Sequence, residues 1–134
     1  MDVGLGIAGL ISVALAFGHH TLGVVWVLPG LTKERLPGTP FGSPSMTESM
    51  IRVTWYIVTV FALAAGGLLM TLAWVEDADP KMVLLRWFAV MWLGATAMAL
   101  WVSARRVRKV RSLLRLPVPL LWVVIAVLCW NAST

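Results

Sequence analysis

The sequence predicts an all-α fold, a polytopic membrane protein that forms a four-transmembrane-helix bundle as a single domain over residues 1–134. Two observations predict this class. Hydrophobic residues make up 60% of the 134 residues and the mean hydropathy is +0.88, which is more apolar surface than a soluble domain of this size can bury. Only 13% of the residues are charged, and they are clustered, so that long charge-free windows remain.

Four windows are long enough to cross a bilayer core about 30 Å thick, which takes about 20 helical residues. These windows are about 3–28, 51–75, 82–103 and 113–130. The first follows Asp2 rather than a basic segment and exceeds the apolar run of a signal peptide, so we expect a permanent helix. Ser45 and Glu48 have the spacing of a capping box, which predicts that the second helix begins there with a polar turn. The fourth window has Pro117 and Pro119 in its first turns, where a missing backbone donor costs least.

Basic residues predict the orientation, because Lys and Arg in short loops stay in the cytoplasm. The loops 29–50 and 104–112, with their flanking turns, hold nine of the 11 basic residues, whereas the opposite face holds Lys81 and Arg86. We therefore expect these two loops in the cytoplasm, both termini in the periplasm, and a location in the cell inner membrane. Indole rings favour the headgroup level, which suits Trp26, Trp55 and Trp101 near the cytoplasmic interface and Trp74, Trp87 and Trp130 near the outer one.

A basic run follows the third window and contains Arg105, Arg106, Arg108, Lys109 and Arg111. Between two membrane helices we expect it to fix the topology and to bind anionic lipid headgroups, each charge contributing about 1 kcal/mol near the surface. A docking surface for an acidic protein partner is the alternative, and a nucleic-acid partner is not expected.

The only two histidines, His19 and His20, are adjacent in the first window. On a 3.6-residue period His19 lies on a stripe of small or polar residues that suits close helix packing, namely Ala8, Ser12, Ala16 and Gly23. His20 lies about 100° around the helix, on a bulky apolar stripe. There it either ligates the metal of a haem or a bacteriochlorophyll, a role that suits His19 less, or forms a hydrogen bond to a neighbouring helix, which we favour.

Helix packing is also expected in the second window, where Ala62 and Gly66 have small-x-x-x-small spacing. Chemistry is not expected. No Asp or Glu lies inside the four windows, although proton-coupled transporters usually need one. Cys129 is the single cysteine, which excludes an internal disulfide and a multi-thiolate metal site. No nucleophile–base–acid set, phosphate-binding loop or metal motif is present, so we expect neither an enzyme nor a metal site.

The segments "HHTLG" and "MIRVTWYIVTVFALAAGGLL" resemble those of a loose family of small four-helix bacterial integral membrane proteins whose function is not established. The family shows a His-x-x-x-Gly element in the first helix, matched by His19 and Gly23. It also shows an Arg-x-x-Trp element that opens the second helix, matched by Arg52 and Trp55. Family members often carry an acid after the glycine and a histidine after the tryptophan, where this chain has Val24 and Tyr56. The resemblance implies the four-helix fold and weakens any catalytic role.

These features together favour a non-catalytic accessory subunit of a larger bacterial energy-conversion complex, photosynthetic or respiratory, which stabilises the assembly through contacts with other membrane subunits. Two other hypotheses stay open. One is a haem- or bacteriochlorophyll-binding protein that uses His20 or His19. The other is a small homo-oligomeric transporter or channel lined by Ser12, Thr59 and Thr71.

Overall fold

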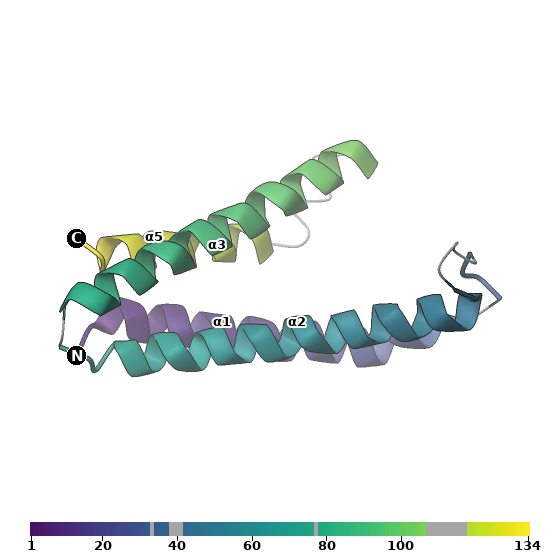
Figure 1. Ribbon diagram of the computed structural model, residues 1–134, viewed down its shortest axis with the longest axis horizontal. Coiled ribbons are helices and arrows are strands. Elements are labelled where there is room, and N and C mark those ends of the chain that lie inside the picture. Colours follow the sequence, from purple (N-terminus) through teal and green to yellow (C-terminus); the bar gives the residue numbers. More distant parts are fainter. Residues whose placement is uncertain (33, 38–41, 77, 107–117) are drawn as a thin grey trace.

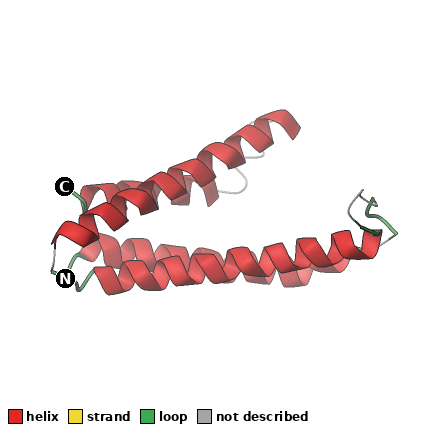
Figure 2. Cartoon of the chain, in the orientation of Figure 1, coloured by secondary structure: helices red, strands yellow, loops and turns green. Residues whose placement is uncertain are grey.

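The computed structural model describes residues 1–32, 34–37, 42–76, 78–106 and 118–134 of the chain. This part is all-helical and contains no strand (Figure 2). Its main helices are α1 (Val3–Leu22), α2 (Pro44–Leu72), α3 (Ala78–Arg106) and α5 (Val118–Asn131). The predicted class, a bundle of apolar helices, is confirmed.

Helix α1 begins directly after Asp2, whose carboxylate accepts the backbone N–H of Leu5 at 3.1 Å and so caps the first turn. Its α-helical part ends at Leu22, but the chain continues as a π-helical turn, Gly23–Val27, and a 3₁₀ turn, Leu28–Gly30. The predicted window 3–28 therefore matches one continuous helical segment, in which the last two turns have altered hydrogen bonding.

Helix α2 begins earlier than the predicted window because the segment before the membrane supplies a complete helix start. Pro44 is the first helical residue, where its fixed φ and missing N–H are tolerated, and the Ser43 hydroxyl accepts the N–H of Met46 at 3.4 Å. The capping box predicted at Ser45 and Glu48 is wrong, since Ser45 lies inside the helix. The helix also takes up the last residues of the predicted loop 29–50.

Helix α3 begins before and ends after the predicted window 82–103. Helix α5 contains 14 residues and so rises about 21 Å, less than the thickness of a bilayer core. The first part of the predicted fourth window, residues 113–117, and most of the predicted loop 104–112 lie outside the described residues.

The helices form two pairs (Figure 1). Helix α1 packs along α2, α3 packs along α5, and α1 also contacts α5. Two glycines allow the close approach of α1 and α2. A Cβ atom added to Gly9 would lie 2.7 Å from the Gly66 carbonyl oxygen, and one added to Gly66 would lie 2.9 Å from that of Gly9. Only glycine leaves room for this backbone contact.

The hydrophobic core occupies the end of the bundle where both chain termini lie (Figure 1). Its buried side chains come from all four helices and from the residue after α2, and they are Leu5, Ala8, Leu69, Leu72, Ala73, Leu85, Ala89, Trp92, Ile125, Ala126 and Cys129. Towards its C-terminal end α3 diverges from the α1–α2 pair, as Figure 1 shows. The far half of that pair therefore lies away from the four-helix core.

Three described segments are long and apolar enough to cross a membrane, namely Val3–Gly30, Pro44–Leu72 and Asp79–Trp101. Only 17–22% of the residues in their most apolar windows are buried within the chain, so their outer faces require an apolar surrounding. These findings indicate an integral membrane protein.

Candidate functional site

Two sequence elements far apart in the chain meet at the far end of the α1–α2 pair. The indole of Trp55, from α2, lies against Gly23, where any Cβ atom would overlap it. Its Nε1–H donates a hydrogen bond of 3.1 Å to the backbone carbonyl oxygen of His19. The rings of His19 and Trp55 are stacked, with centroids 4.2 Å apart and planes inclined by 8°. His19, Gly23 and Trp55 thus form one contact, named here the His19–Trp55 cluster.

The π-helical turn begins at this cluster. The N–H of Gly23 is directed at the carbonyls of both His19 and His20, and the N–H of Leu28 reaches back five residues to the carbonyl of Gly23. The His19 carbonyl thus accepts both the Gly23 N–H and the Trp55 indole N–H, at the point where the backbone bonds change from four-residue to five-residue spacing. Such π turns often mark functional positions in helices.

Arg52 connects α2 to the 3₁₀ turn that follows α1 and the π-helical turn. Its guanidinium donates to the Leu28 carbonyl oxygen at 3.0 Å and pairs with the Glu48 carboxylate at 2.9 Å. Glu48 therefore orients Arg52 instead of capping α2, and Arg52 satisfies a carbonyl at the end of the first apolar segment. All four residues of the His-x-x-x-Gly and Arg-x-x-Trp elements are used in these contacts.

A groove of about 280 Å³ opens beside the cluster. It is lined by His19 from α1 and by Met50, Ile51, Thr54, Trp55 and Val58 from α2. In the described part of the chain, the Nε2 atom of His19 is buried and has no hydrogen-bond partner. A buried polar atom without a partner loses its hydration without compensation, which makes this atom the point of interest in the groove.

His20 follows His19 on α1 and is exposed. Its ring centroid is 5.9 Å from that of Tyr56, with planes inclined by 46°. Each histidine ring thus lies beside an aromatic residue of α2, His19 beside Trp55 and His20 beside Tyr56. Among the residues that the structure describes, no group of three or more His, Cys, Asp or Glu side chains could hold a metal ion.

The residues predicted for helix packing lie at or near the contact of α1 with its neighbours. Ala8, Ser12, Ala16, Gly23 and Gly66 are buried, and Ala62 is partly buried. The Ser12 hydroxyl donates to the Ala62 carbonyl oxygen at 3.1 Å, across the two helices. This bond and the contact of Gly9 with Gly66 hold the middle of the pair.

The hydroxyls predicted to line a channel are bonded to backbone carbonyls within the pair. Thr59 is buried and donates to the Trp55 carbonyl at 3.2 Å, while Thr71 is exposed and donates to that of Gly67 at 3.0 Å.

Only part of the predicted basic run lies within the described residues. Arg105 and Arg106 belong to the last turn of α3, whereas Arg108, Lys109 and Arg111 lie outside the described residues.

No protein-family model, curated protein or solved structure matches this chain. The resemblance to small four-helix bacterial membrane proteins stays a prediction. What the structure adds is that the four residues carrying the resemblance make neighbouring contacts between α1 and α2. Sequence reasoning placed His19 on the protein-facing stripe but did not pair it with Trp55. The glycine of His-x-x-x-Gly could have indicated a close contact at this position, because a large ring approaches a helix closely only where the residue opposite it is a glycine.

Proposed function

We propose that this chain is a multi-pass protein of the bacterial inner membrane and acts as a non-catalytic accessory subunit of a larger energy-conversion complex, photosynthetic or respiratory. Its role is to stabilise the assembly through contacts with other membrane subunits. One observation carries the proposal, which is that small residues form a stripe on the outward face of α2 as well as on its inward face.

The outward stripe consists of Ala64, Gly67 and Thr71, which are all exposed and follow one another at helical spacing. A Cβ atom added to Gly67 would meet no atom of the chain within 4 Å. Large apolar side chains are the usual covering of a lipid-facing surface, and Phe61 on the same helix is 71% exposed. Small residues instead allow a second helix to approach closely, so the stripe suits another membrane subunit.

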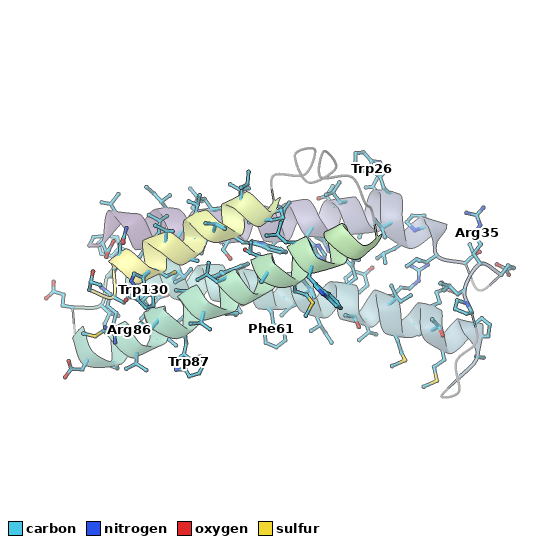
Figure 3. All side chains as sticks on the ribbon, turned by 90° about the horizontal axis from the view of Figure 1, so that it is seen from above. Trp26, Arg35, Phe61, Arg86, Trp87 and Trp130 are labelled. Atoms are coloured by element: carbon cyan, nitrogen blue, oxygen red, sulfur yellow. The ribbon has the colours of Figure 1, made fainter. Side chains whose placement is uncertain are left out.

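Charge and aromatic positions support the proposed orientation. Figure 3 shows Arg86, Trp87 and Trp130 towards the end that holds the termini, and Trp26 and Arg35 towards the opposite end. Trp26, Trp87 and Trp130 are at least half exposed, which is the arrangement of two aromatic belts at the membrane interfaces. With the predominantly basic loops in the cytoplasm, both termini lie in the periplasm.

The anionic headgroups of membrane lipids are the second proposed partner, through the basic residues from Arg105 to Arg111. A non-catalytic role is supported by the use of the polar groups. In the described residues, the hydroxyls of Ser12, Thr59 and Thr96 all bond to backbone carbonyls, which leaves them engaged in helix packing.

The experiment is affinity purification of the tagged chain from its native membranes, with a Gly67→Trp variant and a matched Leu68→Trp control. Leu68 adjoins Gly67 and is 40% exposed, but it lies about 100° around the helix. We expect other membrane subunits to purify with the wild type and with Leu68→Trp, and to be lost from Gly67→Trp. A chain that purifies alone in all three cases would refute the proposal.

The same preparation tests the other two hypotheses. A visible and near-infrared spectrum whose bands track the isolated chain and change in His20→Leu would favour a haem or bacteriochlorophyll site. A homo-oligomer that mediates solute flux in liposomes without partners would favour the channel. For the accessory role we expect any pigment bands to stay unchanged in His20→Leu.

A further inference from the structure

The groove beside the His19–Trp55 cluster lies on the same helical face that forms the core at the other end of the molecule. Along α2, Trp55 and Val58 continue the stripe of the core residues Leu69 and Leu72 at spacings of three and four residues. Along α1, Leu15 packs against the core and His19 follows four residues later. The groove therefore continues the core-forming face of the α1–α2 pair, and its lining residues come from these two helices.

We propose that this groove binds the head group of a membrane-dissolved quinol, a flat ring that carries hydroxyl groups and an apolar tail. The ligand class follows from three properties of the groove, namely its size, its aromatic wall and its single buried nitrogen without a partner. The proposal concerns binding only and is independent of the accessory role.

The size of the groove selects a small molecule over a protein segment. Its volume of about 280 Å³ is close to the lower limit of small-molecule pockets, about 300 Å³. A transmembrane helix is about 10–12 Å across with its side chains and would not enter such a space. Met50, Ile51 and Val58 make the wall apolar, so the ligand arrives from the bilayer and leaves its tail there.

The stacked rings of His19 and Trp55 favour a ligand that has a flat head group. His19 and Trp55 both line the groove and lie nearly parallel, 4.2 Å apart. Aromatic rings attract one another in offset-stacked and edge-to-face arrangements, so a third ring gains more here than an acyl chain does. The Trp55 ring is held by its hydrogen bond to the His19 carbonyl and by its contact with Gly23, so this part of the wall is formed in advance.

The unpartnered nitrogen of His19 favours a ligand whose ring carries a polar substituent. In the described part of the chain its Nε2 atom has no partner, and a neutral imidazole nitrogen either donates or accepts one hydrogen bond. A quinol hydroxyl can serve either form. A half-turn of the imidazole about χ2 keeps the ring plane and the stacking while it exchanges Nε2 with Cε1, so the nitrogen has two positions on a ring that lines the groove.

Because the chain contains two histidines, selective ¹⁵N-histidine labelling gives an NMR spectrum in which only His19 and His20 contribute. We would titrate the labelled protein in lipid nanodiscs with a benzoquinol that carries a decyl chain. The expected result is a saturable change in the Nε2 shift of His19 and an unchanged signal from His20, with His20→Gln giving the assignment. No saturable change at His19 would overturn the proposal, as would equal changes at both histidines.

Two variants and one further ligand make the test specific. Val58→Trp fills the groove and should weaken the apparent affinity by about tenfold or more, since the ring contact and the hydrogen bond are lost together. Val53→Trp adds the same side chain on an exposed face of α2 and should bind as the wild type does. Decylbenzene should give no saturable change, because it lacks hydroxyls. Binding retained in Val58→Trp, or an equal response to decylbenzene, would refute quinol recognition.

Discussion

Replacing Gly23 with alanine is expected to destabilise the folded chain by about 2–4 kcal/mol, because the new methyl group would occupy the position of the Trp55 indole. The indole must then move away from α1. That movement breaks its hydrogen bond to the His19 carbonyl, which contributes about 1 kcal/mol, and its stacking on the His19 ring, which contributes about 1 kcal/mol.

Two further effects act in opposite directions. Partial accommodation in a packed contact leaves strain of about 1–3 kcal/mol, whereas alanine is favoured over glycine in a helix by about 1 kcal/mol. Together with the two lost contacts, these effects give a net loss of about 2–4 kcal/mol. The lower value applies if the indole moves away without leaving strain. Gly18→Ala is the matched control, because a Cβ atom there meets nothing within 4 Å. This control should be neutral or up to about 1 kcal/mol more stable.

The assay is reversible unfolding of the purified protein in mixed micelles, followed by circular dichroism as the fraction of denaturing detergent rises. Trp55→Phe provides a second measurement, since it keeps an aromatic ring but removes the indole donor, and it should cost about 1 kcal/mol. If Gly23→Ala unfolded at the same detergent fraction as Gly18→Ala, the proposed seat of Trp55 on Gly23 would be wrong.

Three other substitutions test separate contacts. Gly66→Leu should prevent α1 from packing on α2, because even a Cβ atom lies 2.9 Å from the Gly9 carbonyl, and the folded fraction in detergent should collapse. Ser12→Ala removes the hydroxyl bond to Ala62, and unfolding measurements should show a loss of about 0.5–1 kcal/mol. Arg52→Ala removes one of the two hydrogen bonds that the Leu28 carbonyl accepts, the other coming from the Leu31 N–H, and hydrogen exchange should accelerate in the turn Leu28–Gly30 while the core at Leu69 stays protected.

The sequence predicted much of the fold because apolar length and charge clustering act locally along the chain. The windows located the apolar helices, and the 3.6-residue period placed Ala8, Ser12 and Ala16 on one face, which is the buried face. The helix starts were less predictable. Hydropathy detects the membrane part of α2 but not the polar turns before it, and Ser43 with Pro44 provided an earlier start than Ser45.

The candidate site was less predictable than the fold because periodicity gives a face of a helix and not the partner across it. Gly23 can indicate that some large group approaches the helix closely, but it does not identify that group as Trp55, 32 positions later in the chain. The same limit applies to Glu48. Its spacing from Ser45 fits a capping box and its spacing from Arg52 fits an ion pair on a helix, and only the observed helix start decides between the two.

The position of the His19–Trp55 cluster follows from the shape of the bundle. Near the termini, four helices share a core, and the α1–α2 pair is held there by burial among its neighbours. Among the described residues, the far half of this pair contributes none of the core side chains, yet α1 and α2 stay joined at His19 and at Leu28. The contacts that hold them there are hydrogen bonds from Trp55 to the carbonyl of His19, in α1, and from Arg52 to the carbonyl of Leu28, in the 3₁₀ turn, strengthened by low dielectric surroundings. The hydrogen bond between Trp55 and His19 also fixes two residues that line the groove, so the contact that joins the helices shapes the groove as well.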